Sequence, residues 1–323
     1  MSEEQSPPVC YRHRNRQTYL RCVRCDKPIC ADCRIDAPVG FQCPDCVAEG
    51  RKSVRRARTA FGGRATTAFG GGAGGSAGVV TKTMIGVNVA MFVLTLAVGG
   101  MRAVGGAATE LHYAFAQASF FFYNTSTGGT VARPDAHIDL FGNPLSLPGV
   151  STGGEYRLLT STFMHYGVIH LLFNMVVLWI LGRVLEKDLG SLRFLSVYLL
   201  SGLAGSVATY LFADPATLSA GASGAIYGMF GALIMINRRL SRDNSGLYVL
   251  LGLNLVLTFM VPSISITGHL GGLVGGAITG AILSFTPRNK RYLHWIGFAA
   301  FLALMAALTV WRTGVLEAQY GLV

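Results

Sequence analysis

Apolar residues gather in seven long runs between Thr83 and Arg312, whereas the first 64 residues are polar and basic. A helix that crosses a bilayer needs about 20 predominantly apolar residues, with a range of about 17–25. The runs predict seven membrane-spanning helices, at about 83–99, 166–185, 192–212, 219–237, 247–261, 266–285 and 293–312. The fifth run is short for a span, and residues 100–165 predict a long loop without one.

This pattern predicts an all-α polytopic membrane protein with a small polar module in front of it. We expect the module at residues 1–50, a linker at 51–81, the seven-span region at 82–312 and an outer tail at 313–323. The linker is first basic and then reads FGGGAGGSAG, which is typical of a flexible tether. Charged residues make up 13% of the chain, against about 25% in soluble domains, which excludes one large soluble core.

Basic residues predict the orientation of the spans. The loops after the second, fourth and sixth runs carry Lys and Arg, whereas those after the third and fifth carry neither. Because cytoplasmic loops are rich in Lys and Arg, we expect a cytoplasmic N-terminus and an outer C-terminus, in a bacterial plasma (inner) membrane. Residues 51–64 hold six basic residues and no acidic one, which favours contact with anionic lipids of the bilayer over nucleic acid.

The seven cysteines and one histidine form four pairs near the N-terminus, each with two residues between its members. The pairs are Cys10 with His13, Cys22 with Cys25, Cys30 with Cys33, and Cys43 with Cys46. Eight such ligands predict two structural Zn²⁺ sites with four protein ligands each. No apolar run precedes Thr83, so we expect the module in the cytoplasm, where disulfides are disfavoured. It would recruit an unknown partner or substrate tail, or else gate or anchor the membrane region.

A serine lies between glycines at the start of the fourth run. Ser223 is bracketed by Gly221 and Gly224 in SAGASGAIYG, a setting that permits a tight turn and a close approach of substrate backbone. Serine and glycine are also common where membrane helices pack together. Ser223 is therefore the candidate nucleophile, with Ser206 and Ser219 as alternatives.

A histidine opens the sixth run. His269 is followed by Gly272, Gly276 and Gly280, and this spacing lets helices approach very closely. Ionisable residues inside a membrane are functional candidates by default. Close packing would carry His269 to the Ser223 hydroxyl, where a neutral imidazole can take the serine proton as a general base.

Other polar residues lie at the depth that the orientation predicts for this pair. His165, His170 and Asn174 lie at the start of the second run, and Tyr227 follows Ser223 by one helical turn. His170 and Asn174 share one helix face, so they can donate to an oxyanion together with the Ser223 amide. The alternative is that they only hydrogen-bond neighbouring helices. The Tyr227 ring is positioned to hold an imidazole.

Three motifs together resemble the rhomboid intramembrane serine proteases over about 155–285. They are GASG with Tyr227, HxxxN from His170 with His165 before it, and HxxGxxxG from His269. The resemblance implies a six-helix core, here with a seventh span, and a Ser223–His269 dyad that needs no cofactor. It also implies an oxyanion site of His170, Asn174 and the Ser223 amide, supported by Tyr227. The substrates would be transmembrane proteins cut near the outer boundary.

Glu186 also matches a structural position of this family, whereas Tyr156-Arg157 stands where many members have Trp-Arg, and Gly268 where many have Ala. The zinc-ligand pairs resemble B-box fingers, which implies that the first pair joins the third and the second joins the fourth. A catalytically silent receptor or chaperone for transmembrane clients is the alternative function. A transporter would place charged residues deep in several spans, and the runs lack them.

Overall fold

The computed structural model describes residues 7–37, 39–53, 67, 69, 78–120, 137–140, 143–260, 264–287 and 289–320. It divides into two compact units, Met1–Ala65 and Thr66–Val323. Most of the predicted linker 51–81, including its basic and Gly-rich stretches, lies outside the described residues.

The first unit is small and holds little regular structure. It contains the 3₁₀ turn η1 (Ala31–Cys33), strands β1 (Ile35–Asp36) and β2 (Phe41–Gln42), which pair antiparallel, and helix α1 (Pro44–Ser53). Its buried apolar cluster consists of Ile29 and six cysteines, with Tyr11, Leu20 and Phe41 partly buried around them. So small a cluster provides little hydrophobic stabilisation.

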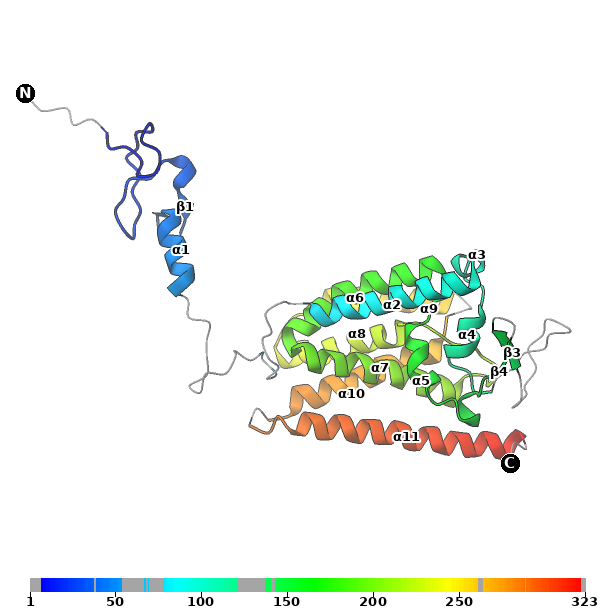
Figure 1. Cartoon of the computed structure of the whole chain (residues 1–323). Helices are drawn as coiled ribbons and strands as arrows, with labels where there is room; N and C mark the ends of the chain where they lie inside the picture. Colours follow the sequence, from blue (N-terminus) through cyan, green and yellow to red (C-terminus); the bar gives the residue numbers. More distant parts are fainter. Residues whose placement is uncertain are drawn as a thin grey trace, which may run out of the picture. The chain divides into compact units, whose positions relative to one another are not determined.

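The second unit is a helical bundle in which each of the seven predicted runs forms a helix. They are α2 (Val79–Gly99), α6 (Gly167–Leu189), α7 (Ser191–Phe212), α8 (Ser223–Arg239), α9 (Ser245–Met260), α10 (Ile266–Phe285) and α11 (Leu293–Tyr320). Helix α8 lies at the centre, in contact with α6, α7 and α10 (Figure 1). Helix α2 packs on α6, and α11 packs along α7 and α10.

Two of the seven predicted spans are helices of fewer than 18 residues. Among the described residues five helices are long and apolar enough to cross a membrane, whereas α9 has 16 residues. Helix α8 has 17, because it begins at Ser223 and not at residue 219. Ser219 instead exchanges backbone hydrogen bonds with Gln117, and Gly221 has φ +141°, outside the helical region. The chain therefore enters α8 as an extended segment, and Ser223 is its first residue.

The first loop contains short elements and, in its described part, no span. They are α3 (Met101–Val104), α4 (Glu110–Phe115), β3 (His137–Leu140) paired with β4 (Asn143–Ser146), η2 (Val150–Thr152), α5 (Arg157–Thr160) and η3 (Ser161–Phe163). The fully buried Arg157 donates to the carbonyls of Pro148 (2.7 Å) and Ala116 (2.9 Å). The Tyr156 hydroxyl donates to the Ala114 carbonyl at 3.2 Å. Tyr156 and Arg157 thus hold the loop together through its backbone.

Helices α8 and α10 meet along a seam of glycines. A Cβ atom at Gly272 would overlap the Gly224 carbonyl, and one at Gly276 would overlap the Gly228 carbonyl. Only glycine permits such contact between backbones. The seam begins at the second residue of α8 and the seventh of α10, so it determines how those two starts lie against each other.

The carboxylate of Glu186 ties α6 to α2 at the opposite end of the bundle. It accepts from the backbone N–H of Val80 and of Thr81 at 2.9 Å, and from the hydroxyls of Thr81 and Ser191 at 2.8 Å. Acidic groups stabilise helix N-termini, which explains a structural role for this carboxylate.

Candidate active site and metal centres

The nearest polar contact between α8 and α10 joins Ser223 and His269. The Ser223 Oγ lies 2.7 Å from Nε2 of His269, within hydrogen-bond distance. His269 is 6% exposed, and Ser223 is half-buried. The glycine seam brings the two helix starts this close, so the predicted pair is in contact.

The His269 ring is held on its face and on its other nitrogen. Tyr227 stacks on it, with ring centroids 4.2 Å apart and planes 15° apart. Nδ1 lies 2.7 Å from Oγ1 of Thr258, which is itself 2.7 Å from the Tyr227 hydroxyl and 2.9 Å from the Asn254 carbonyl. A hydroxyl donates one hydrogen bond and accepts two. Thr258 therefore donates to Asn254 and accepts from Tyr227 and from Nδ1–H of His269.

This pattern determines which His269 nitrogen carries the proton. With the proton on Nδ1, Nε2 has its lone pair directed at the Ser223 hydroxyl. The sequence interpretation missed Thr258, which is 2% exposed on α9. Its only sequence signal is a hydroxyl in a mostly apolar run.

His170 faces the same place from α6. Its Nδ1 accepts from the Tyr166 backbone N–H at 3.3 Å, so in the neutral ring Nε2 carries the proton. A Cβ built on Gly221 would lie 3.0 Å from His170 Nε2 and 3.4 Å from Ser223 Oγ. The space left by the missing side chain of Gly221 therefore adjoins both a hydrogen-bond donor and the serine oxygen.

Asn174 and His165 lie around His170. Asn174 is buried, and its Nδ2 donates to the His170 carbonyl at 2.8 Å, which occupies one of its two N–H groups. The His165 ring lies 5.1 Å from that of His170. Burial, and then the His170 ring, lower the pKa of His165 to about 3.

A further histidine, not singled out from the sequence, fixes the approach to α6. His112 is fully buried, stacks on Tyr166 at 4.4 Å, and donates from Nε2 to the His165 carbonyl at 3.1 Å. Its Nδ1 accepts from the Thr109 backbone N–H at 3.2 Å. Burial lowers its pKa, so the ring stays neutral. The first loop thereby positions the segment that leads to His170.

The alternative serines have other partners. Ser206 Oγ lies 3.2 Å from Ser161 Oγ. Ser219 is held by backbone hydrogen bonds to Gln117. Among the three candidate serines, the one with a described contact to His269 is Ser223.

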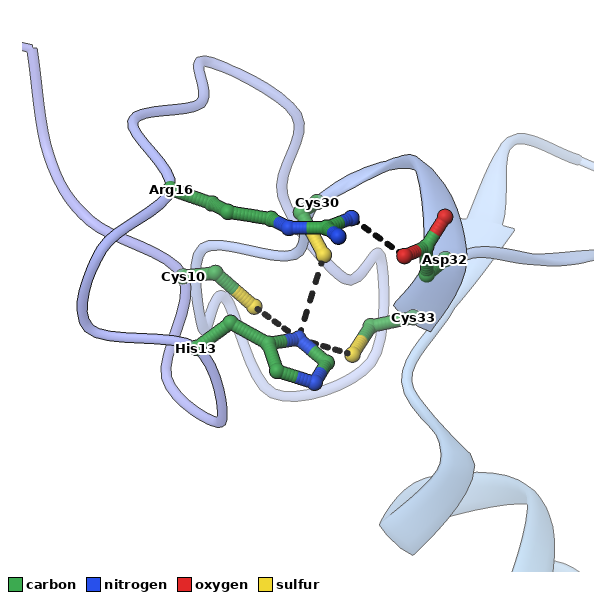
Figure 2. A network of polar contacts seen from close by, with 6 residues as sticks. All are labelled: Cys10, His13, Arg16, Cys30, Asp32 and Cys33. Carbon is green, nitrogen blue, oxygen red and sulfur yellow. Dashed lines mark hydrogen bonds and ion pairs between the residues drawn. The ribbon is translucent and has the colours of Figure 1, made fainter.

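Ligand atoms in the first unit form two groups of four, each within 4.8 Å of one another. One group is Cys10, His13, Cys30 and Cys33, and the other is Cys22, Cys25, Cys43 and Cys46. The first ligand pair is thus grouped with the third and the second with the fourth. Figure 2 shows the first group converging on His13, whose Nδ1 is 3.3 Å from the sulfurs of Cys30 and Cys33 and 3.9 Å from that of Cys10.

These groups fit zinc in spacing and in chemistry. Ligand bonds of about 2.0–2.3 Å at tetrahedral angles put donor atoms about 3.5–3.8 Å apart, and Cys25 and Cys43 sulfurs are 3.7 Å apart. Burial raises the pKa of Cys10 and of Cys22, but backbone N–H groups outweigh it and lower each to about 6. Thiolates at neutral pH are the form that binds metal. An ion pair of Arg16 with Asp32 lies beside the first group (Figure 2).

Comparison with known proteins places the similarity in the helical unit. The family model described as "Rhomboid domain" matches residues 152–286. That stretch contains α6 to α10 and the residues of the Ser223 site from His165 to His269.

Three relatives show how far the similarity extends. The rhomboid protease GluP of Bacillus subtilis is 41% identical over 139 residues, which are 42% of this chain and 27% of that protein. The putative rhomboid protease YdcA of the same organism is 34% identical over 149 residues, 45% of this chain and 74% of that protein. RHOMBOID-like protein 7 of Arabidopsis thaliana is 38% identical over 140 residues, 41% of this chain and 44% of that protein. The matched stretch thus spans about a quarter of GluP and three quarters of YdcA.

Proposed function

Because the chain belongs to the rhomboid family of multi-pass membrane proteins, we propose that it is an intramembrane serine endopeptidase. Its proposed substrates are other transmembrane proteins, cut near the outer boundary of the membrane. The observation that carries this proposal is the 2.7 Å contact between Ser223 Oγ and His269 Nε2, with Nδ1 of the same ring engaged by Thr258.

The first half of the reaction forms an acyl-enzyme. Nε2 of His269 takes the proton from the Ser223 hydroxyl as Oγ attacks the scissile carbonyl carbon. The tetrahedral intermediate collapses when His269 returns that proton to the leaving amine. In the second half, His269 takes a proton from water, the resulting hydroxide attacks the acyl carbon, and Ser223 leaves with the proton.

The carbonyl oxygen becomes negative in each tetrahedral intermediate and needs donors. The space beside Gly221 adjoins Nε2–H of His170 and the start of α8, whose first N–H groups have no intrahelical partners. We assign the oxyanion to this space, with His170 and the Ser223 amide as donors and Asn174 as a further donor. Such donors are worth about 2.7–4 kcal/mol each in the transition state.

Thr258 completes the catalytic pair as a positioning residue. It holds the proton on Nδ1 of His269, which leaves Nε2 free to accept from Ser223. It takes the place that a carboxylate occupies in a Ser-His-Asp triad, without bringing a charge into the membrane.

The N-terminal module is proposed to hold two structural Zn²⁺ ions and to recruit a cytoplasmic partner or substrate tail. Each ion would be bound by one of the two four-ligand groups. Zinc would supply the stability that the small apolar cluster of this unit lacks.

Cleavage by the purified full-length protein in liposomes tests the proposal. A panel of single-span substrates should be cut by the wild type, whereas Ser223→Ala and His269→Ala should each abolish cleavage. The double variant should be no worse than either single one, because the two residues act as a unit. Ser206→Ala is the matched control, since Ser206 bonds to Ser161, and it should retain activity.

Two outcomes would contradict the assignment. Cleavage by Ser223→Ala together with an inactive Ser206→Ala would show that the nucleophile is Ser206 and not Ser223. Tight binding of the substrates by a well-folded wild type that cuts none of them would favour a silent receptor or chaperone.

A further inference from the structure

A second polar hollow lies at the opposite end of the bundle from the Ser223 site. It is formed where α8 and α10 end and α11 begins, and it is lined by Arg239, Leu240, Leu283, Ser284, Arg291 and His294, among others. Its cavity volume is about 50 Å³, and it is partly open to solvent. One water molecule needs roughly 10–15 Å³ of such volume, so the hollow has room for several water molecules or for a phosphate group at its open mouth.

Cationic side chains surround the hollow, and no described carboxylate forms an ion pair with them. Arg239 and Arg291 line it, and Arg193 donates from Nε to Nδ1 of His294 at 3.3 Å. None of these three guanidinium groups makes an ion pair with a described carboxylate of the bundle. Arg239 uses its Nε–H for the Ser284 carbonyl at 3.1 Å, which leaves its two terminal nitrogens available.

The acidic residues at this end are engaged elsewhere. Glu186 accepts from the start of α2 and from Ser191. Asp188 pairs with Arg242, and Asp243 accepts from Ser245. The positive charge of the hollow is therefore uncompensated by the described protein groups around it.

Ser284 provides an independent sign that a ligand belongs here. It is 3% exposed and lines the hollow, yet its Oγ has no hydrogen-bond partner among the described residues. A buried hydroxyl without a partner is unfavourable, and native proteins rarely leave one. An anion in the hollow would accept from it.

The start of α11 adds to the attraction for an anion. This helix begins at Leu293 and runs for 28 residues, so its dipole favours negative charge at the hollow. Arg291 and His294 flank that start.

The remaining walls match the rest of a lipid. Leu240 and Leu283 are apolar and line the same hollow. Tyr292 and Trp295 lie at this end of α11, with Tyr292 60% and Trp295 39% exposed, and the Arg193 guanidinium lies 5.7 Å from the Trp295 ring centre. Exposed Tyr and Trp residues are typical of the headgroup level of a membrane.

We propose that this hollow binds the phosphate group of an anionic lipid headgroup between α8, α10 and α11. The terminal nitrogens of Arg239, the Arg291 guanidinium and the Ser284 hydroxyl bind the phosphate oxygens. Leu240 and Leu283 contact the glycerol and upper acyl chain. The site is separate from Ser223 and His269, so it stands whether or not the chain is a protease.

Lipid binding by the full-length protein in a neutral detergent tests the site. Phosphatidylglycerol added in mixed micelles should raise the melting temperature of the wild type and bind saturably, whereas phosphatidylcholine should do so much more weakly. Arg291→Gln and Ser284→Ala should each weaken phosphatidylglycerol binding about fivefold. Arg238→Gln is the matched control, because Arg238 is exposed, neighbours Arg239 and does not line the hollow.

A second measurement, with inorganic phosphate added at constant ionic strength, distinguishes a lipid headgroup from free phosphate. A shift by the lipid alone supports a headgroup, and an equal shift by inorganic phosphate, lost in Arg291→Gln, assigns the same hollow to free phosphate. The proposal is overturned if neither probe stabilises the wild type. It is also overturned if Arg238→Gln weakens binding as much as Arg291→Gln does, because general surface charge would then explain the effect.

Discussion

The hydroxyl oxygen of Thr258 lies 2.7 Å from Nδ1 of His269, on the far side of the ring from Ser223. Thr258 is on α9 and His269 is on α10. The orientation of the proposed base thus depends on a helix whose side-chain contribution to the site described above is Thr258.

Replacing Thr258 with valine removes this hydrogen bond and keeps the shape of the side chain. We expect kcat to fall about tenfold, since a hydrogen bond of this kind contributes about 1–1.5 kcal/mol. KM should stay unchanged, because Thr258 lies behind His269. Thr258→Ser should restore most of the rate.

A buried threonine elsewhere provides the control for that experiment. Thr95 on α2 is fully buried and donates to the Met91 carbonyl at 2.8 Å. Thr95→Val should leave kcat near the wild-type value. An equal loss in both variants would show that Thr258 acts only through helix stability.

Gly221→Ala should reduce cleavage about 10²–10³-fold, the range for losing an oxyanion donor. The added methyl group would occupy the space beside His170 Nε2 and Ser223 Oγ, at a residue with φ +141°. Gly153→Ala separates strain from blockage, because Gly153 has φ +98° but open space around its missing Cβ. If Gly221→Ala and Gly153→Ala had comparable activity, the oxyanion would not occupy the space beside Gly221.

His170 and Asn174 should differ in their effect on turnover. His170→Ala removes a donor that adjoins the space beside Gly221, and we expect kcat to fall about 10²–10³-fold. Asn174→Ala should lower kcat less, because one of its N–H groups is already bonded to the His170 carbonyl. Steady-state kinetics on one substrate compares the two. A change in KM alone for either variant would make that residue a substrate-binding group.

The full-length protein should contain two zinc ions per chain. Cys30→Ser and Cys22→Ser should each reduce the content to about one, since each removes a ligand from a different group. Arg16→Gln is the control, because it breaks the neighbouring ion pair with Asp32 and leaves every ligand in place. Mass spectrometry under native conditions reads the stoichiometry. Loss of both ions from either cysteine variant would contradict two separate sites.

The zinc module should be dispensable for the chemistry itself. Deleting residues 1–64 should leave cleavage of a generic substrate largely intact, because every proposed catalytic group lies in the second unit. The choice among native substrates is then the property to compare. Complete loss of generic cleavage in a well-folded truncation would couple the module to catalysis.

The helices were predictable because membrane-length apolar runs are a strong signal, and all seven runs are helical. The residue at which α8 begins was not predictable from the sequence. It depends on the pairing of Ser219 with Gln117, a residue about a hundred positions away in the first loop. Local composition carries no information about such a contact.

The Ser223–His269 contact was predictable because glycine spacing indicates where helices approach. Thr258 and His112 were missed for a physical reason. Thr258 on α9 reaches His269 on α10, and His112 meets the His165 carbonyl from a distant part of the first loop. Neither contact has a fixed spacing along the chain. Likewise, the spacing of the zinc ligands predicts each pair of neighbouring ligands. Which two pairs share one site is decided by the fold of the module.

The backbone contacts of Gly272 with Gly224 and of Gly276 with Gly228 also limit how the site can fail. Sliding α10 along α8 by a single residue would move His269 by about 1.5 Å, more than half the length of its 2.7 Å contact with Ser223, and would misalign that contact. Interlocked carbonyls and glycines oppose any such intermediate position. Loss of activity on heating or in harsh detergent should therefore be all-or-none, coinciding with separation of the two helices and not preceding it as a gradual decline.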